Sequence, residues 1–216
     1  MTTSEQPDFA PTFIKPSDAD QVIEIERQEL KRMGLATDDI ERRLPDASEL
    51  EDDLHARSFL YHGIYTGTDL IAFGSTEFWT PIDDAQFARN SLTRSLLTII
   101  DRPSKAVSKF PHAINRIAVE ESASDVTRFR ATHGLLRTIT RIADHEDTVI
   151  HTVVYNPRNN PIVGPLEDFN FRDTGLRTGL TKTEGVSTKY TRPRRNSVRG
   201  KKVPIFSQGF QIATEI

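Results

Sequence analysis

The residues between 114 and 171 combine positive charge with an order of elements that builds an anion site. Residues 114–119 (INRIAV) read as an apolar strand, the basic run 128–134 (RFRATHG) follows as a turn, and residues 135–142 have the apolar spacing of a helix. A helix start offers backbone N–H groups and the positive end of the helix dipole. With Arg128 and Arg130 beside it, this turn is predicted to bind a phosphate-like anion.

Side chains that could move a proton lie near the strands of this stretch. His112 precedes the first strand, Glu120 closes it, and Tyr155 ends the apolar run at 149–155, while Glu77 belongs to an earlier apolar run. A base that takes a proton from an amine works best with a pKa near neutrality, and histidine is the residue type that titrates there. The candidate catalytic residues are therefore His112, Glu77 and Tyr155.

The order of these motifs resembles the acyl-CoA-binding core of the GCN5-related N-acetyltransferase superfamily. Residues 117–119 stand where the family's fourth strand pairs with the pantetheine arm, and residues 128–133 stand at its phosphate loop, Arg/Gln-x-x-Gly-x-Gly/Ala. The chain departs from that loop, because Ala131 and His133 replace the two glycines. An asparagine after the fifth strand and the final Asn170-Phe171 also match. The resemblance implies that acetyl-CoA is held by Ile117, Ala118, Val119, Arg128, Arg130, Ala131, Thr132, His133, Gly134 and Asn159.

A second departure concerns the acid that protonates the departing thiolate. The family usually has a tyrosine five residues before the final phenylalanine, and Leu166 stands there. The acid would then be another group, such as Tyr155 or a water. The positions that correspond to the family's base, Ala113 and Asn115, cannot titrate, which leaves His112 and Glu77 as the nearby candidates.

The surrounding elements must position these residues, and their order predicts an α/β (α+β) fold. Helices interspersed with a hairpin and a parallel strand pair indicate a mixed, mostly antiparallel central sheet flanked by helices, which the resemblance identifies as the acyl-CoA N-acyltransferase fold. Residues 1–11 are expected to be disordered, and residues 12–192 to form the acyl-CoA-binding domain. A helical insertion is predicted at about 82–112, and residues 193–216 form a basic tail.

The amino-acid composition excludes some kinds of catalytic and metal site and indicates a cellular location. The chain has 36% hydrophobic and 27% charged residues, a net charge of −3 and no cysteine. Thiolate metal sites and cysteine nucleophiles are therefore excluded, and the scattered histidines predict no metal site. No apolar run approaches the roughly 20 residues of a membrane span, and the N-terminus has no signal-peptide core, so we expect a cytoplasmic protein without a membrane partner.

The resemblance implies an N-acyltransferase that moves an acetyl group from acetyl-CoA to an amine by direct attack. Loss of the loop glycines and of the tyrosine keeps an alternative open, namely a non-catalytic CoA-binding or regulatory module. The first 54 residues contain fifteen acidic and six basic residues, which favours a cationic acceptor. No aromatic residues interleave with the basic run 192–202, which argues against nucleic acid as a partner. Apolar residues at 203–212 are expected to dock on the domain or on a second copy, which would make a homodimer.

Overall fold

The computed structural model describes residues 9–57, 60–78, 112–155, 157–158, 160–178 and 187–193. Seven strands form one sheet in the order β1-β2-β3-β4-β5-β7-β6. β4 and β5 pair in parallel, whereas the pairs β1–β2, β2–β3, β5–β7 and β6–β7 are antiparallel. The mixed, mostly antiparallel sheet flanked by helices that the sequence predicts is confirmed. Of the insertion predicted at about 82–112 and the tail predicted at 193–216, residues 82–111 and 194–216 lie outside the described residues, whereas His112 already belongs to a strand.

The chain divides into two compact units, and β4 and α6 contribute to both. The first unit comprises residues 1–76 and 115–139, and the second comprises residues 77–114 and 140–216. The described elements, in chain order, are β1 (Thr12–Phe13), the 3-10 helix η1 (Pro16–Asp18), α1 (Ala19–Arg32), α2 (Thr37–Glu41), α3 (Ala47–Arg57), β2 (Tyr61–Thr66), β3 (Asp69–Phe78), β4 (His112–Val119), α6 (Asp125–Glu146), β5 (Ile150–Tyr155), α7 (Val163–Asp168), β6 (Arg172–Thr178) and β7 (Ser187–Arg192).

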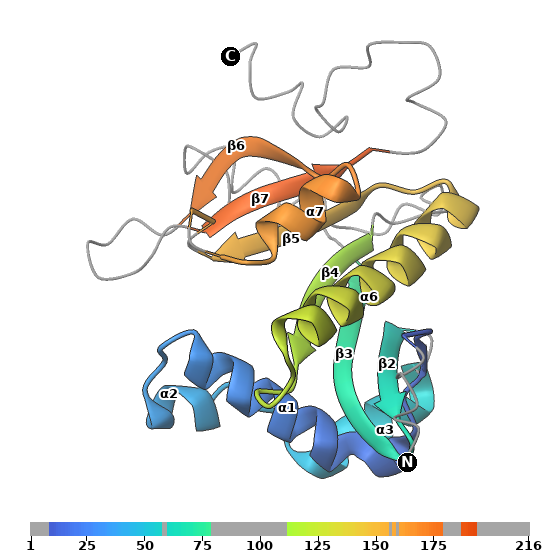
Figure 1. The fold of residues 1–216 in the computed structure, drawn as a ribbon, viewed down its shortest axis with the longest axis vertical. Coiled ribbons are helices and arrows are strands. Elements are labelled where there is room, and N and C mark those ends of the chain that lie inside the picture. Colours follow the sequence, from blue (N-terminus) through green and yellow to red (C-terminus); the bar gives the residue numbers. More distant parts are fainter. Residues whose placement is uncertain are drawn as a thin grey trace, which may run out of the picture. The chain divides into compact units, whose positions relative to one another are not determined.

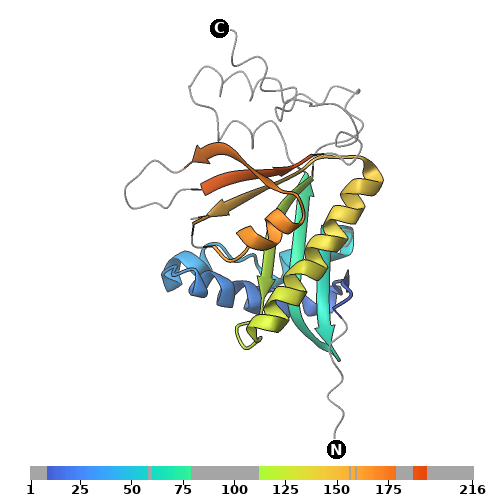
Figure 2. The same cartoon turned by 45° about the horizontal axis from the view of Figure 1, so that its top comes forward.

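Helices cover both faces of β2 and β3 in the first unit (Figures 1 and 2). On one face, residues of α1 and α3 join Leu70, Phe73 and Ala118 in one apolar cluster. On the other face, Ala131 and Leu135 of α6 pack with Ile64, Ile71, Ala72 and Val119. Two glycines with positive φ end the local elements as the sequence suggests: Gly34 follows α1 and Gly67 makes the β2–β3 turn.

The second unit is built on the β5–β7–β6 ladder. β7 pairs along the whole of β5, from Ile150 opposite Arg192 to Tyr155 opposite Ser187. The short helix α7 precedes β6, and its Leu166 is buried together with Phe171. Arg192 joins three parts of this unit, because its guanidinium donates to Asp144 of α6 and to the carbonyl of Phe169 after α7.

Candidate functional site

The middle of β4 is open, although β4 is an inner strand of the sheet. Its ladder with β5 covers His112, Ala113 and Ile114 and goes no further. β4 continues for five more residues, to Val119. Asn115 in this continuation is exposed, and Arg116 and Ile117 are partly exposed. Within the part of the chain that the structure describes, no strand pairs with this side of residues 115–119.

The hydrogen bonds of β4 show which backbone groups are open. Strand residues point their N–H and C=O groups alternately to the two neighbouring strands, and β3 and β5 flank β4. The N–H of His112 donates to Val149, just before β5, whereas the N–H of Glu120, which has the same parity, donates to Ile71 of β3. The alternation therefore slips by one residue within β4, as it does at a β-bulge.

The side chains of β4 show the same slip. His112 contacts Glu146 of α6, and Val119, of opposite parity, packs with Ala131 of the same helix. After the slip, the backbone groups of Ala118 face β3, and those of Ile117 and Val119 face away from it. Of the three residues predicted to pair with the pantetheine arm, the backbone parity thus favours Ile117 and Val119.

The turn between β4 and α6 lies earlier than the sequence predicts. The predicted turn at 128–134 is wrong as local structure, because α6 begins at Asp125 and these residues form its first turns. Ser124 caps the helix: its side-chain oxygen accepts from the N–H of Thr127 at 3.2 Å, and its carbonyl accepts from the N–H of Arg128 at 2.8 Å. A serine followed by an acid in the first turn is the sequence signal that marks this start.

Arg128 fixes that turn with its side chain. Its guanidinium donates to the carbonyl of Val119 at 3.2 Å, of Glu120 at 2.8 Å and of Glu121 at 3.3 Å, and it lies 4.0 Å from Glu29. These bonds tie the guanidinium to the carbonyl of the last β4 residue and to the two carbonyls that follow it. The geometry therefore gives Arg128 a positioning role in the turn.

Packing accounts for the other residues predicted at the phosphate turn. Ala131 and Thr132 are buried, and His133 stacks on Phe129 with ring centroids 3.9 Å apart. Arg130 lies over the ring of Phe9, 5.9 Å from its centroid. A Cβ on Gly134 would come within 2.6 Å of the carbonyl oxygen of Phe9, so this glycine allows the N-terminal segment to cross the helix closely.

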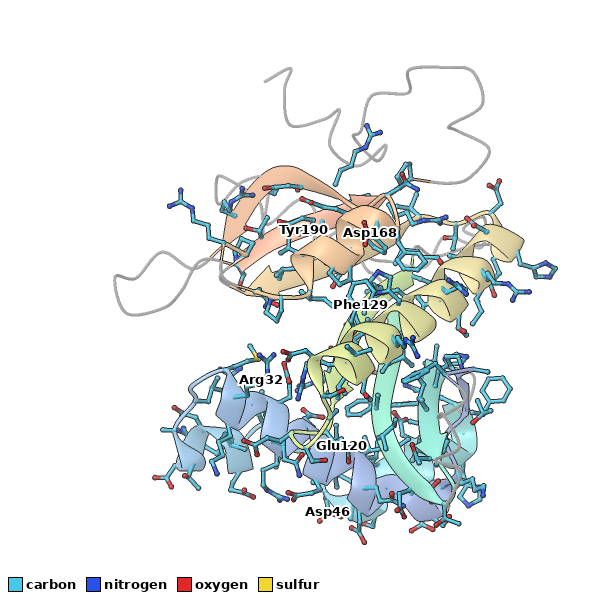
Figure 3. All side chains as sticks on the ribbon, viewed as in Figure 1. Arg32, Asp46, Glu120, Phe129, Asp168 and Tyr190 are labelled. Carbon is cyan, nitrogen blue, oxygen red and sulfur yellow. The ribbon has the colours of Figure 1, made fainter. Side chains whose placement is uncertain are left out.

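The observed turn is acidic. Glu120 ends the strand side of it, and Glu121 and Asp125 follow before the exposed Phe129 (Figure 3). The first N–H groups of α6 still lack intrahelical partners, as they do at every helix start. An anion there would therefore be bound by backbone N–H groups and the helix dipole, against the charge of the neighbouring carboxylates.

The candidate catalytic residues lie on three strands, β3, β4 and β5. His112 begins β4 and is buried, with its Nε2 atom 2.6 Å from Oε2 of Glu146. Ile117 lies five positions further along the strand, about 17 Å at 3.3 Å per residue. Glu77 is exposed near the end of β3, and Tyr155 is the last residue of β5. Asn159 lies outside the described residues. Their roles in proton transfer and CoA binding stay predictions.

No protein-family model matches this sequence, and no curated protein matches it. Solved structures do match. The acetyltransferase of the GNAT family from Streptococcus pneumoniae is 12% identical, with 84% of this chain and 96% of that chain covered and a TM-score of 0.58. The ribosomal-protein-S18-alanine N-acetyltransferase from Escherichia coli is 13% identical, with 90% and 97% covered and a TM-score of 0.54.

A third structure, the PaiA N-acetyltransferase from Thermoplasma acidophilum in complex with coenzyme A, is 13% identical, with 83% and 96% covered and a TM-score of 0.53. This chain has the GCN5-related N-acetyltransferase fold. At these identities the likeness concerns the fold, so the activity has to be argued from the site.

Within this acetyltransferase fold, Leu166 is a core residue. It is 1% exposed, and its carbonyl accepts from the N–H groups of Phe169 and Phe171. We expect Leu166→Tyr to destabilise the protein by about 1–3 kcal/mol, because a larger side chain would overfill the core. Thermal unfolding would measure this, with Leu166→Met as the control of conserved volume. An unchanged melting temperature together with higher turnover would show instead that the position can carry an acid.

The first unit of the acetyltransferase fold also contains an ion pair that the sequence did not reveal. Glu26 of α1 contacts Nη1 of Arg116, in the open stretch of β4. The Glu26 side chain is 8% exposed, and burial raises the pKa of Glu26, whereas Arg116 opposes that shift. Glu26 lies four residues after Val22 and four before Leu30, so a carboxylate on the apolar stripe of α1 was the available signal.

Two further properties of the described residues bear on the site. No helix among them is long and apolar enough to cross a membrane. In the same residues, no three histidine, aspartate or glutamate side chains gather in a group that could hold a metal ion.

Proposed function

We propose that the protein is an acyl-CoA-dependent N-acyltransferase that moves an acetyl group from acetyl-CoA to an amine. The observation that carries this proposal is the open side of β4, which leads directly into the turn before α6. A strand with unpaired backbone groups suits the amide-rich pantetheine arm, and the following helix start suits a pyrophosphate. The structural neighbours support the proposal, since one was solved with coenzyme A.

In the proposed reaction the amine nitrogen attacks the thioester carbonyl. A C–N bond forms, the C–S bond breaks, the amine loses one proton to a base, and coenzyme A leaves as the thiolate. The N–H groups of Ile117 and Val119 would hold the arm and polarise the carbonyl, so that catalysis is mainly positioning and charge stabilisation. The N–H groups of Asp125 and Val126 would receive the pyrophosphate.

A non-catalytic CoA-binding module is the second candidate. Two observations favour it: Leu166 is packed in the core, where the family has its acid, and Glu120, Glu121 and Asp125 surround the helix start. Calorimetry with CoA, followed by an acetylation assay on a panel of amines, separates the two. Turnover supports the enzyme, binding without turnover supports the module, and failure to bind CoA contradicts both.

A pair of proline substitutions tests the direction of the β4 backbone. Proline is tolerated in a sheet where its missing N–H faced no strand. We expect Ile117→Pro to leave the fold largely intact and to weaken CoA binding roughly tenfold, the worth of one hydrogen bond of about 1.4 kcal/mol. Ala118→Pro, by contrast, should lower the melting temperature, because the assigned parity directs the N–H of Ala118 toward β3.

Ile117→Ala serves as the control, since it shortens the side chain and keeps the N–H. Circular dichroism and calorimetry measure the two effects. If Ile117→Pro unfolds the protein and Ala118→Pro does not, the assigned parity is wrong.

A further inference from the structure

Arg116 is a cation at the open middle of β4. It directly precedes Ile117, whose backbone groups face away from β3, and it follows the exposed Asn115. Its side chain reaches Glu26 of α1, so it projects to the face of the sheet that α1 covers. The side chain is 33% exposed and its carboxylate partner is 8% exposed. The buried carboxylate of Glu26 thus restrains the guanidinium, which remains partly accessible to solvent.

The Glu26 carboxylate uses only part of the hydrogen-bond donor capacity of the Arg116 guanidinium. Arginine has five N–H donors in a planar fork that matches a carboxylate bidentately. In the described part of the chain, Glu26 is the one ion-pair partner of Arg116, and it is contacted through a single nitrogen. Neighbouring cations differ, because Arg27 and Arg32 each donate at least twice to carboxylates of α1 and α2.

We infer that Arg116 binds a carboxylate of the acceptor, which makes the acceptor an amine with a carboxylate close by, as in an α-amino acid. The inference rests on the proposed acyl transfer. Arg116 lies one residue from Ile117, about 3.3 Å along the strand, so an amine placed for attack near Ile117 brings a carboxylate a few bonds away into reach.

Local charges permit such a ligand despite the acidic first segment. Ion pairs neutralise much of the surface of α1 and α2: Glu24 and Glu41 pair with Arg27, Glu29 pairs with Arg32, and Asp39 pairs with Arg42. The buried Glu26 contacts the Arg116 guanidinium through one nitrogen, restrains the side chain and leaves other N–H donors of the fork for a ligand. A second carboxylate on the outer edge of the fork would complete the arrangement without moving the arginine.

The test compares acceptors that differ only in the carboxylate. Wild-type protein with acetyl-CoA is assayed on the standard α-amino acids and on their carboxamides, and binding of the same compounds to the CoA-loaded protein is followed by calorimetry. For each amino acid that is acetylated, we expect the free acid to be preferred over its carboxamide roughly 10–100-fold in kcat/KM. This is the range of a charge-assisted hydrogen bond. Arg116→Ala should remove that preference through KM and leave CoA affinity unchanged. Arg116→Lys should restore part of it.

Two further variants serve as controls for the Arg116→Ala result. Arg57→Ala removes an exposed arginine of α3 from the same unit and should change nothing. The double variant Glu26→Leu, Arg116→Met removes both charges, so that no carboxylate is left buried without a partner if Arg116→Ala unfolds. It should fold, bind CoA and show no carboxylate preference.

The outcomes separate this inference from the proposed function. Equal use and equal binding of acids and amides by wild-type protein that binds CoA overturn the inference. So does an unchanged preference in the double variant. Failure of wild-type protein to bind CoA overturns the proposed function itself.

Discussion

Arg192→Ala is expected to destabilise the protein by about 3 kcal/mol, the lower end of the range for breaking a buried ion pair. The guanidinium donates to both carboxylate oxygens of Asp144, at 2.7 and 3.0 Å, and to the carbonyl of Phe169 at 3.0 Å. The two side chains are 13% and 19% exposed, so the loss would leave Asp144 largely desolvated without its cation. Denaturant unfolding measures the change.

Arg177→Ala is the matched control for this prediction. Arg177 also donates to both oxygens of an aspartate, Asp173, but these side chains are 41% and 40% exposed. An exposed pair contributes about 0–1 kcal/mol, so the variant should unfold close to wild type. Equal losses in the two variants would show that burial does not set the strength of the Arg192 interaction.

Acid is expected to destabilise the protein from about pH 6.5 downward, through His151. Burial, aided by the positive charge of Lys189, lowers the pKa of His151 to about 2, and its Nδ1 atom lies 2.9 Å from Oγ1 of Thr191. The unfolded chain binds a proton at this residue near pH 6.5 and the folded chain does not. The stabilising contribution of neutral His151 is therefore fully present above that pH. Below it, the unfolding free energy falls by about 1.4 kcal/mol per pH unit.

His151→Gln isolates this effect, because glutamine keeps a polar partner for Thr191 and cannot titrate. The variant should show a flatter decline of unfolding free energy between pH 6.5 and 5 than wild type. His62 adds to the same slope, since burial also lowers its pKa, so the variant does not become fully flat. Identical slopes for wild type and His151→Gln would contradict the prediction.

Local patterns predicted the elements well where the physical cause is local. The alternation of apolar residues on either side of Gly67 predicted the β2–β3 hairpin, because a positive φ at that glycine, +64°, is all that the turn needs. This turn depends on residues within a few positions of one another.

The predicted turn at 128–134 is wrong as local structure for a reason that is also physical. The run 128–134 has the charge of an anion site, but the cap at Ser124 allows α6 to begin at Asp125. Arg130 and Gly134 are predicted to hold CoA, which stays a prediction, but the sequence did not indicate that Phe9, more than a hundred positions earlier, lies beside both. Contacts between distant segments leave no periodic signal in the chain.

The sequence by itself determined the order of strands and helices and, through that order, the acetyltransferase fold, because periodicity, caps and turn glycines act over short distances. Only the tertiary structure decided which groups are available to a ligand. The end of the β5 ladder at Ile114, the slip within β4, the occupation of Arg128 by strand carbonyls and the pairing of Arg116 with Glu26 all arise when separate segments meet. Burial and pairing set the chemistry of a side chain, and both depend on the whole fold.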